Sequence, residues 1–297
     1  MQDATTPADI TESALASIED CPDDRLRNVL RSLLIHLHGF AVEVGLRQSE
    51  WEAGIEFLTQ VGKITDENRQ EFILLSDTLG FSTLVDALAG VAPGTATEST
   101  ILGPFWAADS PLREYGDSIA EQPGGDPAWV YGCIRDVEGR PIAGVELDVW
   151  QAASEGLYAV QDSDAPEAHL RGRFLARDDG SYAFLGVRPA PYSIPTDGPV
   201  GRMLGATKRD SWRPAHIHMI ASKAGFERLV THIFDAETPY LDADPVFGVK
   251  PSLIRTFARR ALDDPETPPG VTGAWYSVAN DLVLAPSGAA SPDEGSQ

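Results

Sequence analysis

The hydrophobic pattern of the chain changes near Gly94, and this change constrains the fold more than any other feature. Before it, apolar residues recur at three-and-four spacing, which is typical of amphipathic helices. After it, as far as about Pro286, Gly and Pro separate short runs of period-two or β-branched character, such as "SYAFLGV" and "RLVTHIFDA". We therefore predict an α+β protein with a helical unit over 1–100, an all-β sandwich over 101–286 and a disordered acidic tail over 287–297.

The helical unit divides into several expected helices. The longest is expected over 23–45, where Asp23 and Asp24 suit the positive end of the helix dipole. Shorter helices are expected over 51–61, from the capping residue Thr65 to Gly80, and over 82–90. His36 and His38 lie on the longest helix about 200° apart, so they cannot share a ligand.

Composition excludes several classes of function. Among 297 residues, 45 acidic and 23 basic side chains give a net charge of −22, which repels nucleic acids and anionic membranes. No apolar run is long enough to insert into a bilayer, and the start "MQDATTPADI" lacks signal-peptide character, so we expect a cytoplasmic protein. Cys21 and Cys133 belong to no disulfide or zinc pattern.

Two histidines stand two residues apart in "SWRPAHIHMI", Ser211 to Ile220. In an extended strand, His216 and His218 would share one face, with Ile217 turned to the other. Two neutral imidazoles on one face can bind a single metal ion. A half-buried strand with merely hydrogen-bonded histidines would show the same spacing.

Further donors in the β region are few. His169 and His232 are the remaining histidines, and Asp178 and Asp179 fall in a turn where exposed acids are usual. Tyrosine is the other donor type. Tyr158 closes "LDVWQAASEGLY", and Tyr192 lies in the proline-stiffened "RPAPYSIPTDGP". Either residue, taken alone, would also suit a packing role.

Four ordered segments together resemble the intradiol ring-cleavage dioxygenases, which bind a non-haem ferric ion through two tyrosines and two histidines. These segments are "GPFW" at 103–106, "LDVWQA…GLY", "RGRF…DDGSYAFLGVRPAPYSIPTDGPVG" and "WRPAHIHM". The resemblance covers the chain from the N-terminal helices to about residue 280. It implies the Fe³⁺ ligands Tyr158, Tyr192, His216 and His218. Phenolate suits this ligand set because it is a hard anionic donor that favours Fe³⁺.

The helical unit resembles that of the catechol-type branch, which implies a homodimer and a lipid-lined channel with a bound phospholipid. Several segments, including "THIFDAETPYLDADPVFGVK", are most similar to enzymes that cleave hydroxyquinol (benzene-1,2,4-triol) with O₂. His232 stands where plain catechol enzymes tend to carry Gln. The family's substrate-binding positions map to Leu74, Asp77, Ile101, Leu102, Gly103, Pro104, Phe105, Ile194, Pro195, Arg213 and Val246.

The resemblance implies 3-hydroxy-cis,cis-muconate, the enol form of maleylacetate, as the product. Tyr192 would accept a substrate proton, and Arg213 would stabilise the electron-rich ring. Asp77 could accept a hydrogen bond from the additional ring hydroxyl, although a solvated helix residue would give the same pattern. Cleavage of catechol or chlorocatechol by the same site remains an alternative, and a sandwich that only binds carbohydrate or protein is a more distant one.

Overall fold

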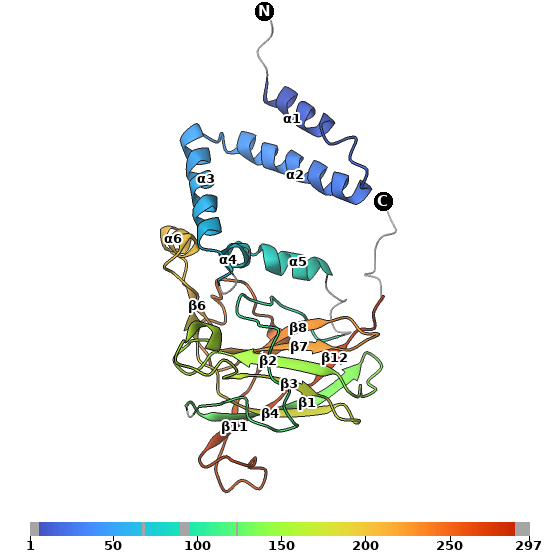
Figure 1. The fold of residues 1–297 in the computed structure, drawn as a ribbon, viewed down its shortest axis with the longest axis vertical. Helices are drawn as coiled ribbons and strands as arrows, with labels where there is room; N and C mark the ends of the chain where they lie inside the picture. The colour runs from blue at the N-terminus through green and yellow to red at the C-terminus, as the bar shows by residue number, and fades with distance from the viewer. Residues whose placement is uncertain (1–5, 67–68, 90–95, 123, 289–297) are drawn as a thin grey trace, which may run out of the picture. The chain divides into compact units, whose positions relative to one another are not determined.

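The computed structural model describes residues 6–66, 69–89, 96–122 and 124–288 (Figure 1). The chain forms two compact units, Met1–Gln60 and Val61–Gln297, and their boundary falls within one helix. The division predicted at residue 100 stays a prediction. Most of the predicted tail, from residue 289 onward, lies outside the described residues.

The first unit contains helices α1 (Pro7–Ala16), α2 (Asp24–Glu43) and most of α3 (Gln48–Lys63). Helix α2 agrees with the expected long helix, and its N-cap Asp23 accepts a hydrogen bond from the Leu26 backbone N–H. Helix α1 was not anticipated, although Thr6 and Asp9 form reciprocal capping hydrogen bonds at its start. Neither α1 nor α2 contains a buried residue.

The second unit contains helices α4 (Glu71–Thr78), α5 (Phe81–Ala89) and α6 (Pro199–Ala206). Helix α4 starts later than predicted from Thr65, and ahead of it the Asp66 side chain accepts the Arg69 backbone N–H. It ends before Gly80, as expected. Helix α6 was not anticipated within the β region. Throughout the described segments, no helix combines the length and apolar character needed to cross a membrane.

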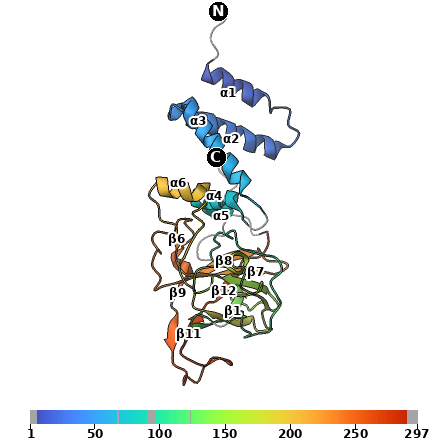
Figure 2. The ribbon, with the colours of Figure 1, turned by 60° about the vertical axis from the view of Figure 1, so that its left-hand side comes forward.

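Two five-stranded sheets make up most of the second unit (Figures 1 and 2). One has the order β10-β11-β1-β12, with β4 pairing to β1, and the other has the order β3-β2-β7-β8-β9. Their bounds are β1 Pro127–Asp136, β2 Glu146–Gln151, β3 Arg171–Leu175, β4 Ser181–Val187, β7 His216–Ser222, β8 Leu229–Asp235, β9 Ile254–Arg255, β10 Ala258–Arg260, β11 Trp275–Ala279 and β12 Leu282–Leu284. A short pair joins β5 (Tyr192–Ser193) to β6 (Trp212–Arg213), and two 3₁₀ turns are η1 (Ala159–Gln161) and η2 (Pro251–Leu253).

The hydrophobic core lies between the two sheets, as expected for a sandwich. It combines side chains such as Val130 of β1 and Phe184 of β4 with Leu147 of β2 and Ile217 of β7. Because neighbouring residues of a strand point to opposite faces, the other face of the second sheet carries a different set of side chains. The candidate site lies on that outer face.

Candidate active site

Strand β7 presents His216 and His218 on the outer face, whereas Ile217 points into the core. On β8, His218 is paired with His232 and His216 with Phe234. All three histidines are buried. The period-two spacing therefore brings the two imidazoles together, as the sequence predicts.

Two tyrosines approach these histidines from loops that follow strands β2 and β4. The Tyr158 hydroxyl lies 3.0 Å from Nε2 of His218. Tyr192 lies on β5, opposite Arg213 of β6, and its ring meets that of Tyr158 edge-on at 5.2 Å. Both tyrosines are buried. The structure thus brings together the four predicted ligands, which come from three separate segments of the sequence.

The spacing of the donor atoms fits a single metal ion. Nε2 of His216 lies 3.1 Å from Nε2 of His218, close to the Tyr158–His218 distance. Two ligand atoms about 2.1 Å from one ion and at right angles to each other would be about 3 Å apart. His216 Nδ1 lies 2.7 Å from the Pro214 carbonyl, so it donates there and leaves the Nε2 lone pair toward the cluster.

The buried surroundings shift the pKa of the histidines and of Tyr158 in ways that suit metal binding. Burial lowers the pKa of both His216 and His218 well below its usual value, so the imidazoles are neutral, as metal ligands must be. Burial raises the pKa of the Tyr158 hydroxyl well above its usual range. A cation beside Tyr158 would reverse that shift and stabilise the phenolate.

His232 completes a group of three imidazoles whose donor atoms lie within 4.8 Å of one another. Its ring is stacked on that of His216, with 4.7 Å between centroids and 19° between planes. Because a ring nitrogen's lone pair lies in the ring plane, one ion cannot lie in both of these nearly parallel planes. We therefore place His232 beside the ligands as a wall of the site and not among them.

Arg213 lies between the predicted ligands and a buried carboxylate. Its Nη1 is 3.2 Å from the Tyr192 hydroxyl and 3.2 Å from Nε2 of His216. Its Nε donates to Oδ1 of Asp244 at 3.0 Å, and both side chains are only 2% exposed. Asp244 was missed at the sequence level. Asp244 lies 31 positions after Arg213 in the sequence, and the loop after β8 brings the two together.

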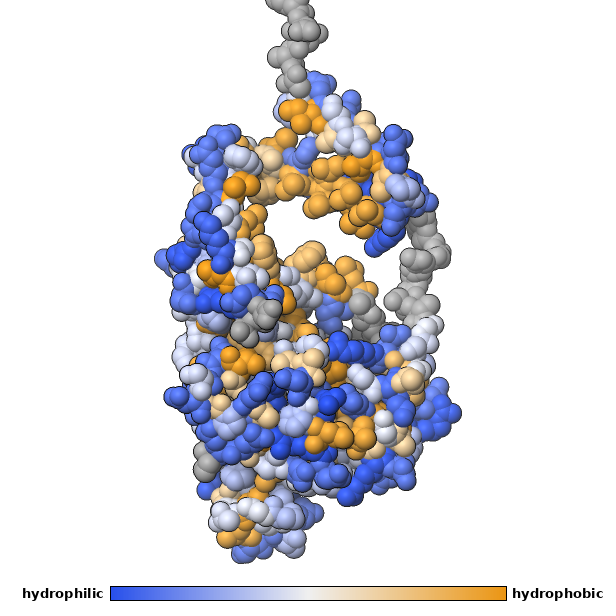
Figure 3. Space-filling model, viewed as in Figure 1, coloured by the Kyte–Doolittle hydropathy of each residue, from blue (hydrophilic) through white to orange (hydrophobic). Residues whose placement is uncertain are grey.

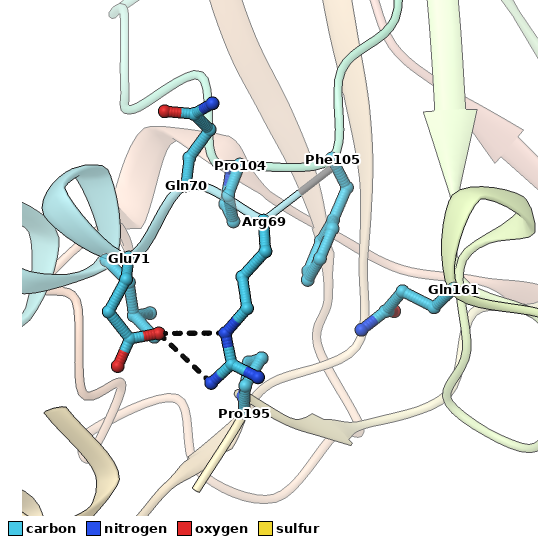
Figure 4. Close-up of a pocket in the computed structure, with 8 residues that line it drawn as sticks. Arg69, Gln70, Glu71, Pro104, Phe105, Gln161 and Pro195 are labelled. Atoms are coloured by element: carbon cyan, nitrogen blue, oxygen red, sulfur yellow. Dashed lines mark hydrogen bonds and ion pairs between the residues drawn. The ribbon is translucent and has the colours of Figure 1, made fainter. Parts of the chain in front are cut away.

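A cavity of about 160 Å³ opens beside this cluster (Figure 4). A cavity of about 150 Å³ is sufficient to hold benzene. Phe105 connects the cavity to the ligands, because its ring stacks on Tyr158 at 4.7 Å. The residues that line the cavity are Arg69, Gln70, Glu71, Leu74, Pro104, Phe105, Gln161 and Pro195.

Four of the predicted substrate-binding residues, Leu74, Pro104, Phe105 and Pro195, line this cavity. Arg69, Glu71 and Gln161 line it as well, but no sequence motif indicated them. Leu102 lines a second cavity of about 410 Å³ next to Trp106 and Asp148.

The remaining predicted positions are not among the residues lining either cavity; they are Asp77, Ile101, Gly103, Ile194, Arg213 and Val246. Gly103 has φ +74°, and a Cβ built there would lie 3.3 Å from Cε1 of His218. A side chain at this position would therefore strain the backbone and crowd the histidine ring.

Asp77 is buried on α4, on the same helix as Leu74. Burial raises the pKa of its carboxyl group, whereas a hydrogen bond from Ser82 and the positive charge of Arg213 oppose that shift. Asp77 thus lies in the electrostatic environment of Arg213 and Asp244. Its role in substrate binding stays a prediction.

Buried imidazole and phenol donors on the outer face of a β-sandwich, beside a ring-sized cavity, are the arrangement expected of a metal-dependent enzyme. Two family models match the chain: "Catechol dioxygenase N terminus" over residues 23–97 and "Dioxygenase" over residues 101–284. The chain belongs to the intradiol ring-cleavage dioxygenase family.

Several relatives are similar over nearly the whole chain. Hydroxyquinol 1,2-dioxygenase of Nocardioides simplex is 46% identical over 284 residues, which cover 94% of this chain and 95% of that one. The enzyme of the same name from a Rhizobium species is 45% identical, with 92% and 94% covered. The crystal structure of hydroxyquinol 1,2-dioxygenase from Pseudomonas putida DLL-E4 has a TM-score of 0.86 and 46% identity, with 94% and 98% covered.

Proposed function

We propose that the protein cleaves benzene-1,2,4-triol with O₂ between its adjacent hydroxyl-bearing carbons and gives 3-hydroxy-cis,cis-muconate. The observation that carries this proposal is the buried Tyr158–His218–His216 cluster beside a ring-sized cavity, in a chain of this family. Relatives that bear the hydroxyquinol name and share about 45% of their residues support the choice of substrate. We keep the cytoplasmic location as a prediction from the sequence.

We further propose Fe³⁺ as the cofactor, held by Tyr158, Tyr192, His216 and His218. When bound, a ferric ion supplies Lewis acidity toward the two adjacent hydroxyls of the ring. The phenolates of Tyr158 and Tyr192 favour the ferric over the ferrous state, because two anionic oxygens stabilise the higher charge.

The residues around the ring then have distinct tasks. Tyr192, whose oxygen faces the Arg213 guanidinium, takes a proton from one substrate hydroxyl. Arg213 stabilises the negative charge that builds up on the deprotonated ring. Phe105 and Leu74 supply apolar walls that exclude water and orient the ring plane.

The direct test is O₂ consumption by iron-loaded protein with benzene-1,2,4-triol, with iron-depleted protein as the control. We expect consumption of one O₂ per triol, only in the iron-loaded sample. The alternative substrates, catechol and chlorocatechols, are tested in the same assay. A higher kcat/KM for either one than for the triol would overturn the proposed substrate. Protein that binds no iron and consumes no O₂ would support a sandwich that only binds its ligand.

We propose that the helical unit forms a homodimer and binds a phospholipid there. Apolar side chains are exposed along α2 in the chain as described, including Leu26, Val29, Leu33, Leu37 and Phe40 (Figure 3). The Leu33 side chain is 56% exposed. Burying such a side chain in an interface contributes about 1.5–3 kcal/mol to the free energy of association. Leu33→Glu should therefore produce monomers in light scattering, with iron content unchanged. A dimer of unaltered stability would refute this assignment of the interface.

A further inference from the structure

Arg69 and Glu71 line the cavity, and Asp197, which is not among the lining residues, forms an ion pair with Arg69. Arg69 and Asp197 form a two-point ion pair, with Nη1–Oδ2 at 2.8 Å and Nη2–Oδ1 at 2.9 Å. Nε and Nη2 of Arg69 also donate to Oε2 of Glu71, each at 3.1 Å. Figure 4 shows the Arg69 side chain reaching down beside Glu71 to Pro195. We call Glu71, Arg69 and Asp197 the rim triad.

The rim triad is built into the fold. The Glu71 side chain is 0% exposed, and its Oε1 accepts the backbone N–H of Val200 in the first turn of α6 at 3.2 Å. A Cβ on Gly198 would lie 2.4 Å from Oε1 of Glu71 and 2.7 Å from Nη2 of Arg69, so only glycine leaves room for the triad. Asp197 belongs to the same loop as Pro195, so the ion pair also fixes one wall of the cavity.

The charge of the rim triad is negative overall. The hydrogen bond from Arg69 lowers the pKa of Asp197, which is therefore a carboxylate at neutral pH. The rim triad contains two acidic side chains and one guanidinium. Four donor contacts of Arg69 are directed at these two acids, so its charge is largely neutralised within the protein.

We propose that the rim triad determines specificity, admitting uncharged polyhydroxybenzenes and rejecting rings that carry a carboxylate. This inference rests on the proposed function, in which two adjacent hydroxyls face Tyr158 and Tyr192. The far edge of the ring then points away from the ligands and into the cavity, which both Phe105 and Arg69 line. A carboxylate on that edge is repelled by the net negative charge of the rim triad. A hydroxyl of the triol carries no charge and is not repelled.

The test compares two ligands of nearly equal size and different charge, 3,4-dihydroxybenzamide and 3,4-dihydroxybenzoate. Their dissociation constants are measured by titration calorimetry with the iron-loaded protein at low salt. We expect the wild type to bind the amide about tenfold more tightly, the scale of one screened like-charge contact near a surface. Asp197→Asn makes the triad neutral and should reduce this preference at least threefold.

Two further variants complete the design. Arg69→Gln makes the triad more negative and should increase the preference for the amide, opposite in sign to Asp197→Asn. Asp178→Asn, on the exposed turn between β3 and β4, removes one negative charge elsewhere and should leave the preference unchanged. Equal affinities in the wild type, or an equal shift in Asp178→Asn and Asp197→Asn, would overturn the inference. Failure to cleave the triol would count against the proposed function alone, because the titration does not depend on turnover.

Discussion

Replacing Arg213 by leucine removes a buried cation and leaves the Asp244 carboxylate without its partner. Both side chains are 2% exposed, and two contacts of 3.0 and 3.4 Å join them. Breaking such a pair from one side costs about 3–5 kcal/mol. Asp244 keeps a hydrogen bond from the Gly248 backbone at 3.0 Å, so we expect about 3 kcal/mol of lost unfolding free energy.

The same substitution should reduce turnover without releasing iron. Nη1 of Arg213 faces both the Tyr192 hydroxyl and His216, so its charge acts where the ring becomes electron-rich. Removing one preorganised electrostatic donor lowers kcat by about 10²–10³-fold. Stability is measured by urea unfolding, turnover by O₂ uptake, and iron by elemental analysis. Loss of iron in proportion to activity would refute this reasoning.

A double-mutant cycle separates the electrostatic role from a purely structural one. Asp244→Asn should lower both stability and kcat in the wild type, because Arg213 then loses the group that holds it in place. In the Arg213→Leu background, the same change should have little further effect on kcat. It should also recover part of the lost stability, because it removes an unpaired buried charge. Additive effects on kcat would show that Asp244 does not act through Arg213.

Two further predictions concern the ligands and the substrate. His216→Ala and His218→Ala should each abolish iron binding in elemental analysis, whereas His36→Ala and His38→Ala on α2 should retain it. Equal losses from both pairs would contradict the ligand assignment. Asp77→Ala should lower the ratio of kcat/KM for the triol to kcat/KM for catechol. The expected decrease corresponds to about 1–3 kcal/mol, the contribution of one buried hydrogen-bond partner. An unchanged ratio would mean that Asp77 does not recognise the third hydroxyl.

Local periodicity was sufficient for much of the fold. The three-and-four spacing predicted α2, and the alternation in "AHIHMIAS" predicted that His216 and His218 share a face. Both are properties of a single element, so they follow from the spacing of neighbouring residues. The approach of Tyr158 and Tyr192 is different. The sequence pattern around each tyrosine was equally consistent with a packing role. Only the resemblance to the family predicted that they bind the same metal ion as the histidines.

Contacts between distant segments were beyond the reach of the sequence pattern. Asp244 meets Arg213, and Asp197 meets Arg69 128 positions away, because each acid lies in a loop that the fold brings to its arginine. The local sequence around an exposed acidic residue does not differ from that around an acidic residue that forms an ion pair with an arginine. The late start of α4 at Glu71 has a similar cause, since Asp66 and Arg69 hydrogen-bond to each other ahead of the helix.

Identification of the product formed from benzene-1,2,4-triol tests the central claim most directly. Iron-loaded protein is incubated with the triol and O₂, and the product is identified by NMR and mass spectrometry. Cleavage between the two adjacent hydroxyl-bearing carbons predicts 3-hydroxy-cis,cis-muconate, or its keto form maleylacetate, with both oxygen atoms of O₂ added to the formula of the triol. A semialdehyde, formed by cleavage beside the hydroxyl pair, or recovery of intact triol would contradict the account.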